Sequence, residues 1–227
     1  MKHEIKNLTP EVPQGGNSPF IIDGIHYFIY KKPTDNEAGS VLVSMVESEA
    51  IKSENNSTVL RIPEAINYNN NVFIVVGICQ SAISVDVNEL CLPPTLEIFS
   101  GSSFPNCNIG LISISDSETD APPMIYEENK SLIFDKSGER LIFASNNIPI
   151  GVGEWRGTKI IGEYAFRNYK GKEITIPYSV EYVEPMAFAK AENLRTVYFE
   201  GHIPCGVNIS TFNLVYENVS LKLIRKP

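Results

Sequence analysis

The sequence predicts a mainly β protein with short helical turns, in which repeated units stack into a solenoid with one parallel-strand rung per repeat. Three observations lead to this fold class: a period of about 22 residues between Ile78 and Leu223, an apolar-x-apolar triplet in each copy, and a small residue followed by a large apolar one. A unit this short cannot enclose its own core, so it must bury its apolar face against its neighbours. We also expect an N-terminal antiparallel β cap and a β-hairpin insertion.

Each copy of the repeat is anchored on its small residue. This residue stands at Ala82, Ser103, Ala165, Ala187 and Thr211, and the large apolar residue follows directly at Ile83, Phe104, Phe166, Phe188 and Phe212. Another apolar side chain precedes the anchor, at Ile78, Phe99, Ile161, Val183 and Val207. A small residue followed by a large apolar one suits a tight helical turn, because the backbone packs closely at the small residue while the large one fills the interior.

The triplet that follows each anchor predicts a short strand with one buried face. The triplets are Leu90 with Leu92, Ile112 with Ile114, Ile174 with Ile176, Val197 with Phe199, and Leu221 with Leu223. Pro93 and Pro177 directly follow two of them and end the strand, because proline cannot donate to a strand ladder. Stacked rung over rung, these strands would form a parallel sheet along the solenoid.

These residues resemble the BspA-type leucine-rich repeats of bacterial and protist surface proteins. The matching motifs are IGEYAF followed by ITIPYSVEYVEPMAF, with STVLRIPEAINYNNNVFIVVG as a lead-in, and the resemblance covers roughly residues 58 to 223. It implies a leucine-rich-repeat solenoid. The first copy departs from the pattern, since it lacks the phenylalanine. Only Cys107 occupies the family's cysteine position, where Tyr169 and Ala191 stand in later copies.

Ahead of the array, residues 20–76 are predicted to form the β cap that covers the first apolar rung. The run FIIDGIHYFIY (Phe20 to Tyr30) places Asp23-Gly24 between two apolar segments, which is a strong hairpin signal. Val41 to Val46 and Val72 to Val76 read as further strands. Residues 1–19 have little apolar content and are predicted to be disordered. The solenoid then occupies residues 77–227.

Between about residues 116 and 157 the period breaks. Two apolar runs, Leu132 to Phe134 and Leu141 to Ala144, flank Asp135-Lys136-Ser137-Gly138 and predict a β-hairpin with a glycine-containing turn. The hairpin could loop off the array or replace part of it. We favour an elaborated rung that continues the stack, because the spacing from Phe104 to Phe166 is close to three periods of about 22 residues.

Composition excludes several classes of function. With 43% hydrophobic residues the chain has enough apolar material for a continuous core, in one or two domains. A net charge of −8 argues against nucleic-acid binding and against docking to anionic lipid. No segment reaches the apolar length needed to span a bilayer, so we expect no membrane insertion.

The N-terminus and the cysteines bear on the compartment. The opening residues contain no apolar stretch of a signal peptide, whereas the resemblance implies a secreted or surface protein. Either an export signal has been removed from this chain, which we favour, or the protein stays inside the cell. Cys79, Cys91, Cys107 and Cys205 form no C-x-x-C pair, so we expect buried free thiols.

No constellation of catalytic or metal-binding residues emerges from the sequence. His3, His26 and His202 lack partners at ligand spacing, and hydrolase, metalloprotease and phosphate-loop motifs are missing. The glycines from Gly151 to Gly157 do not fit a dinucleotide loop. The acidic residues from Asp116 to Glu128 match no calcium loop and indicate a solvated face. We therefore predict no enzyme, no cofactor and no metal.

The best candidate surface follows from the strands, because the middle residue of each triplet points away from the core. These residues are Arg61, Cys91, Ser113, Thr175, Tyr198 and Lys222. They would form one stripe along the sheet, which either binds a partner or merely faces solvent. A secondary candidate is Trp155 beside Arg156, since tryptophan and arginine are frequent hot-spot residues, although packing of Trp155 under the hairpin is favoured.

Together these features predict a non-enzymatic extracellular or cell-surface repeat protein that binds another protein through its sheet face. From the resemblance, the specific form implied is adhesion to host extracellular matrix or cell-surface proteins. The alternative is a structural spacer or capping module of a larger surface protein, with no ligand of its own.

Overall fold

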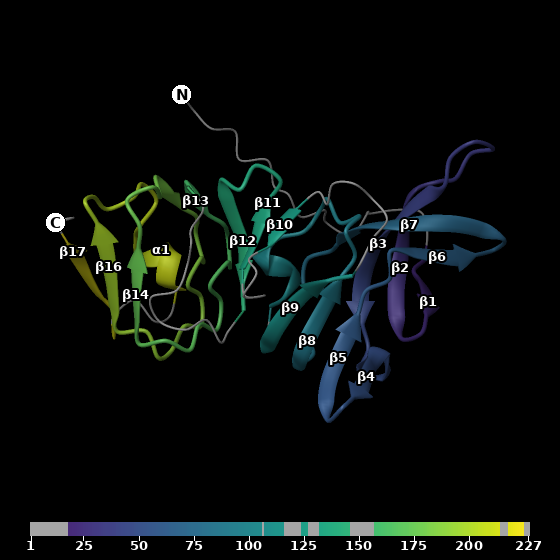
Figure 1. Ribbon diagram of the computed structural model, residues 1–227, viewed down its shortest axis with the longest axis horizontal. Coiled ribbons are helices and arrows are strands. Elements are labelled where there is room, and N and C mark those ends of the chain that lie inside the picture. The colour runs from purple at the N-terminus through teal and green to yellow at the C-terminus, as the bar shows by residue number, and fades with distance from the viewer. Residues whose placement is uncertain are drawn as a thin grey trace.

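The computed structural model describes residues 18–105, 107–115, 124–126, 132–145, 157–213 and 218–224 of the chain. These residues are mainly β, with four sheets and only short helical segments. Along the long axis of the molecule the sheets form two layers, and the chain progresses from the β1 end to the β17 end (Figure 1). None of the helices in these ranges is long or apolar enough to cross a bilayer.

The first half of the chain builds two of the sheets. The first sheet has the order β1 (Phe20–Ile22), β2 (Ile25–Lys31), β3 (Gly39–Val46), β7 (Asn71–Ile78) and β6 (Ala65–Tyr68). The second sheet has the order β4 (Ile51–Glu54), β5 (Ser57–Arg61), β8 (Val87–Leu92) and β9 (Ile109–Ile114). Two 3-10 helices connect their strands, η1 (Ser48–Ala50) and η2 (Gly101–Ser103).

The second half builds the other two sheets. The third sheet has the order β10 (Met124–Tyr126), β11 (Leu132–Asp135), β12 (Arg140–Ala144), β13 (Ile160–Ile161) and β15 (Tyr182–Val183). The fourth has the order β14 (Glu173–Ile176), β16 (Thr196–Glu200) and β17 (Ser220–Ile224). The short helix α1 (Ile209–Phe212) precedes β17.

In the C-terminal repeats, each rung runs from a short strand through a tight turn to a longer strand. The long strands β14, β16 and β17 pair in parallel, and so do the short strands β13 and β15. The turns stack as well, since the Phe166 N–H donates to the Ala187 carbonyl at 2.7 Å and the Phe188 N–H to the Thr211 carbonyl at 2.9 Å. Such close backbone approach requires the small anchor residues that the sequence pattern contains.

The large anchor residues form a column of rings inside these repeats. Phe166 and Phe188 stack with centroids 5.0 Å apart, and Phe188 and Phe212 with centroids 5.5 Å apart. All three are buried. One ring per rung matches the strand spacing of about 4.8 Å, so the column grows at the same step as the sheet.

The hairpin of β11 and β12 stands between the two halves of the core. Its strands are antiparallel, and β12 continues in parallel onto β13, which places the hairpin inside the stack. Ile133, Ile142 and Phe143 pack with the N-terminal core cluster, whereas Leu132, Phe134 and Leu141 pack with the C-terminal one. Burial on both faces explains the continuous apolar runs of this segment.

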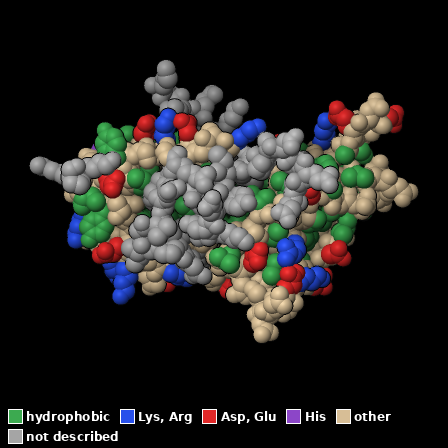
Figure 2. Space-filling view, in the orientation of Figure 1, with side chains coloured by type: hydrophobic (Ala, Val, Ile, Leu, Met, Phe, Trp, Pro, Cys, Tyr) green, Lys and Arg blue, Asp and Glu red, His purple; other side chains and the backbone are tan. Residues whose placement is uncertain are grey.

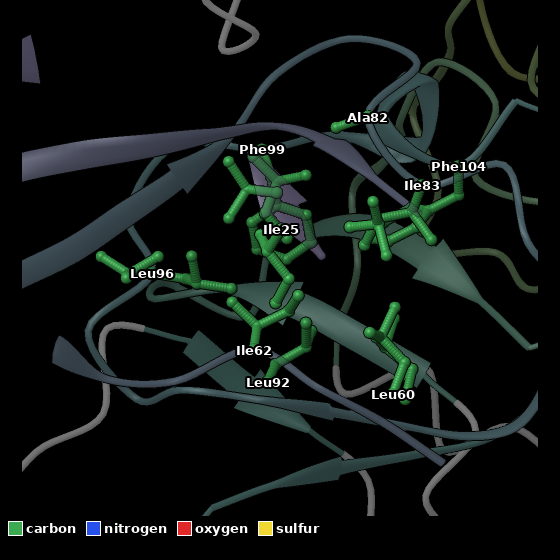
Figure 3. Close-up of a cluster of buried hydrophobic side chains, with 14 of the residues drawn as sticks. Ile25, Leu60, Ile62, Ala82, Ile83, Leu92, Leu96, Phe99 and Phe104 are labelled. Atoms are coloured by element: carbon green, nitrogen blue, oxygen red, sulfur yellow. The ribbon is translucent and has the colours of Figure 1, made fainter. Parts of the chain in front are cut away.

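The N-terminal core lies between the first and second sheets. Figure 3 shows side chains from β2, β5 and β8 converging there, with Ile25, Leu60 and Leu92 among them. All three are at most 4% exposed. Phe104 joins this cluster, and its ring centroid lies 4.7 Å from that of Phe143, so the hairpin is packed into the N-terminal core through an aromatic contact.

Two expectations about this architecture are wrong in part. Residues 20–76 do not pair only in antiparallel fashion, because β3 pairs in parallel with β7 and β5 in parallel with β8. The N-terminal segment therefore already contains parallel strand pairing of the kind that stacked repeats make. The register of β3 on β7 shifts between Val41 and Leu42. The parallel pairing of the longer strands is also not continuous along the molecule, since β9 and β14 belong to separate sheets.

Candidate functional site

The predicted outward residues of the C-terminal repeats lie side by side on the fourth sheet. Thr175 is opposite Tyr198, and Tyr198 is opposite Lys222. Their neighbours along the strands, such as Val197 and Phe199, are at most 1% exposed, whereas Thr175 and Tyr198 are half-buried and Lys222 is exposed. On β14 and β16 strand alternation therefore directs Thr175 and Tyr198 away from the core, as the triplet pattern predicts. On β17 the prediction is wrong in part, because Leu223, expected on the buried face, is 55% exposed.

Within this row, a cation–π contact joins two strands. The Lys222 ammonium lies 5.6 Å from the centroid of the Tyr198 ring. A lysine placed over an aromatic face at this distance is weakly attracted by the ring, by about 0.5–1 kcal/mol at an exposed site. The contact places the ring of a tyrosine, a residue type enriched at protein interfaces, beside a lysine, a type depleted there.

A second aromatic group adjoins the fourth sheet at the end of β14. Tyr178 is 59% exposed and its ring meets the His202 ring edge-on, with centroids 5.1 Å apart. Gly201 permits this contact, because a Cβ there would lie 2.6 Å from the Tyr178 ring. Sequence reasoning missed Tyr178, which follows Pro177 outside the triplet. We define Thr175, Tyr178, Tyr198 and Lys222 as the C-terminal face.

The predicted residues of the N-terminal repeats form a separate row on the second sheet, in the order Arg61, Cys91 and Ser113. Arg61 is bound by Glu54, with Nη2–Oε2 and Nε–Oε1 distances of 2.9 and 3.3 Å. This pairing raises the pKa of Arg61 and lowers the pKa of Glu54. The Ser113 hydroxyl donates to Glu89 at 2.5 Å.

Cys91 is not part of an exposed stripe, contrary to our expectation. It is 4% exposed, because the neighbouring strands and the side chains across them cover it. The N-terminal row is therefore interrupted at its centre and its other members are engaged internally. The predicted stripe thus consists of two separate rows, and only the C-terminal one offers neighbouring accessible side chains. Trp155 and Arg156 lie outside the described residues.

The titratable groups of the described residues form no catalytic constellation. Glu47 contacts His26 at 2.6 Å, which lowers the pKa of Glu47, but no group of His, Cys, Asp or Glu among these residues could hold a metal ion. His202 packs against Tyr178, and His3 lies outside the described residues.

The cysteine prediction is correct for three of the four thiols. Cys79, Cys91 and Cys107 are buried and Cys205 is exposed, and none of the four forms a disulfide. Burial raises the pKa of Cys79 to about 11 and that of Cys107 to about 12. These two thiols therefore stay protonated at neutral pH and act as small apolar side chains, because the thiolate is the nucleophilic form.

One family model matches the C-terminal part of the chain. The model of the BspA type leucine rich repeat region (6 copies) matches residues 155–222. No curated protein matches the chain significantly.

Three solved structures are similar in chain path. A leucine-rich repeat protein from Bacteroides ovatus ATCC 8483 is aligned over 91% of this chain and 53% of its own, at 19% identity and a TM-score of 0.43. This chain therefore spans about half the length of that protein. A leucine rich cell surface protein from Faecalibacterium prausnitzii A2-165 is aligned over 91% and 89%, at 10% identity and a TM-score of 0.31. The pneumococcal vaccine antigen PcpA is aligned over 92% and 88%, at 12% identity and a TM-score of 0.23.

The stacked turns, the phenylalanine column and the matching family model agree over the same C-terminal residues. Residues 155–222, under a third of the chain, are therefore similar to the BspA type leucine rich repeat region.

Proposed function

We propose that this chain is a non-enzymatic repeat protein of the cell surface or the extracellular space, and that it binds another protein through the C-terminal face. The carrying observation is the row of Thr175, Tyr198 and Lys222, in register on neighbouring strands and accessible to solvent. A rigid sheet costs little entropy on binding, because its side chains are already ordered.

The aromatic groups of this face would supply most of the binding free energy. Tyr178 and Tyr198 present large amphipathic rings, and tyrosine is enriched at interfaces and among hot-spot residues. Lys222 adds a positive charge that favours an acidic patch on the partner. Host matrix or cell-surface proteins are the partners that the family resemblance suggests, with adhesion as the biological outcome.

The test is to place negative charge on the face and measure binding. Tyr198→Glu combined with Thr175→Glu should reduce binding to immobilised extracellular-matrix proteins at least 10-fold, an effect of about 1.4 kcal/mol or more. The matched control is Gln80→Glu, which adds a charge at an exposed turn residue far from the face in sequence. Circular dichroism checks that all variants fold. If the double variant binds as well as the control, the face is not the binding surface.

A structural spacer is the second candidate, and the internally satisfied N-terminal row favours it. Arg61 and Ser113 are engaged by Glu54 and Glu89, and Cys91 is buried, so the second sheet has little to offer a partner. In that case the chain would hold other parts of a surface protein apart. Measured binding to matrix proteins that the C-terminal face variants abolish would exclude a purely structural role.

A further inference from the structure

A pocket of about 350 Å³ opens between the first and second sheets, at the end of the molecule far from β17. Residues from β1, β2, β4, β5 and β6 line it, together with η1 and the connections between these elements. Most of its wall is apolar and consists of Ile22, Ile25, Ala50, Pro63, Ala65 and Ile66. A concave, largely apolar site with a few polar groups is the usual form of a small-ligand pocket.

Tyr27 of β2 is the one polar side chain buried deep at this pocket. It is 1% exposed and lines the pocket. A tyrosine combines an apolar ring with a hydroxyl that can donate a hydrogen bond. Burial, and then the charge of Asp23, raises the pKa of Tyr27, so the hydroxyl stays protonated and can donate to a ligand.

Groups of both charges stand around the same pocket. Asp23 is held in a tight turn with a φ of 49°, and Gly24 beside it packs so closely on Ala50 that a Cβ would lie 2.9 Å from the Ala50 nitrogen. Lys52 and Arg61 supply positive charge. Arg61 is neutralised by Glu54, whereas Lys52 forms no ion pair within the described part of the chain. The pocket thus combines one free cation, one carboxylate and one hydroxyl donor around an apolar wall.

We propose that this pocket binds the C-terminal residue of a peptide, or an equivalent N-acylated amino acid, when that residue is apolar. The free carboxylate would pair with Lys52, the acyl carbonyl would accept from the Tyr27 hydroxyl, and the amide N–H would donate to Asp23. The apolar side chain would cover the wall around Ile25 and Ile66. Lys52, Tyr27 and Asp23 then each have a complementary group on the ligand. This site does not depend on the C-terminal face.

The probe is the dipeptide N-acetyl-glycyl-phenylalanine with a free carboxylate, titrated against the whole chain labelled with ¹⁵N. Its binding should perturb amides of β2, β5 and β6 with a Kd in the range of about 1 mM or below. The C-terminal amide of the same dipeptide should bind at least 10-fold more weakly. Absence of binding at about 10 mM, or equal binding of the acid and the amide, would overturn the proposal.

Variants assign the polar contacts. Tyr27→Phe removes only the hydroxyl and Lys52→Gln only the charge, and each should weaken binding at least 3-fold. Lys32→Gln is the matched control, because Lys32 is exposed and does not line the pocket. Thermal unfolding verifies that Tyr27→Phe is folded. If both pocket variants bind like the control, the pocket is not the site.

A longer peptide distinguishes the two possible kinds of ligand, a protein C-terminus and a small N-acylated amino acid. An octapeptide ending in glycyl-phenylalanine should bind more tightly than the dipeptide if protein termini are the ligands, whereas equal affinity indicates a small N-acylated amino acid. An octapeptide with the same two residues at its centre has no carboxylate there and should not bind. Binding of that peptide would contradict the proposed recognition.

Discussion

At the scale of single residues, one buried carboxylate joins the hairpin to the repeats. Two of the helical turns are capped by their own side chains, since Ser100 accepts from the Ser102 N–H and Asn208 from the Ser210 N–H. The turn after β13 has Gly162 at the capping position. Glu184 from the next rung caps it instead, with Oε2 accepting from the Glu163 N–H at 2.8 Å.

The other oxygen of Glu184 pairs with the hairpin. Its Oε1 lies 2.7 Å from Arg140 Nη1, and the Glu184 and Arg140 side chains are 7% and 18% exposed. Gly162 allows the turn to pack closely on β12 beside this pair, because a Cβ there would lie 2.7 Å from the Leu141 carbonyl oxygen. The triplet pattern contains no sign of this contact, which spans three strands.

We predict that Glu184→Gln destabilises the protein by about 3 kcal/mol, because it leaves the Arg140 charge buried without its partner. Urea unfolding measures the loss. Glu181→Gln, at an exposed position of the same rung, is the control and should change stability by less than about 0.5 kcal/mol. Equal stability of the two variants would show that the ion pair contributes nothing.

Glu163 should give the protein a weak pH dependence. Burial, and then the charge of Glu184, raises the pKa of Glu163 above its ordinary value of 4.5. Just above pH 4.5 the folded state therefore holds more protons than the unfolded state, so stability falls as pH rises through this window. Since Glu163 is half-buried, the effect should stay below about 1 kcal/mol. Glu163→Gln should remove it, as denaturant midpoints measured across the window would reveal; an unchanged slope would refute the assignment.

At the scale of elements, close backbone contact shows which rungs are neighbours. Gly101 in η2 lies against the turn of Glu163 and Tyr164, although about 60 residues separate them in the chain, close to three repeat periods. The two turns are therefore direct neighbours in space, despite the residues that lie between them in the sequence. This is the arrangement expected for an elaborated rung, because β12 pairs in parallel with the short strand β13 and so extends its sheet.

We predict that Gly101→Ala destabilises the protein by about 3 kcal/mol, because its Cβ would lie 2.6 Å from backbone atoms that cannot move aside. Gly157→Ala is the matched control. Its Cβ would meet nothing within 4 Å, so only the left-handed backbone conformation with a φ of 75° opposes it, at about 1 kcal/mol. If the two alanine variants are equally stable, the turns are not in contact as described.

At the scale of the whole molecule, the hairpin links two core clusters into one unit. Its strands contribute side chains to both clusters, and Phe143 packs on Phe104 within the N-terminal cluster. On the face seen in Figure 2, hydrophobic, acidic and basic side chains are interspersed where the surface is described. The contacts that link the two clusters are those of the buried hairpin side chains.

We predict a single cooperative unfolding transition for the chain, because neither half completes its core without the hairpin. Differential scanning calorimetry should give a calorimetric enthalpy equal to the van't Hoff enthalpy. Phe143→Ala should lower the midpoint and broaden or split the transition. Two separate transitions in the unmodified protein would contradict this coupling.

The sequence by itself determined the local features of this protein. The small-large anchors and the apolar triplets marked the turns and the long strands, because burial of one face produces a regular spacing of apolar residues in the sequence. Asp23-Gly24 marked its hairpin, because two consecutive left-handed residues are nearly confined to such pairs. Thr175, Tyr198 and Lys222 were placed in one row by alternation alone.

Only the tertiary structure decided which rungs meet and what covers each side chain. The division of the stripe into two rows, the burial of Cys91, the parallel pairing of β3 with β7 and the Arg140–Glu184 pair all join segments far apart in the chain. The pocket around Tyr27 likewise forms only where two sheets face each other. A local pattern records the direction in which a side chain points, whereas its partners depend on how distant segments pack, and no repeat period contains that information.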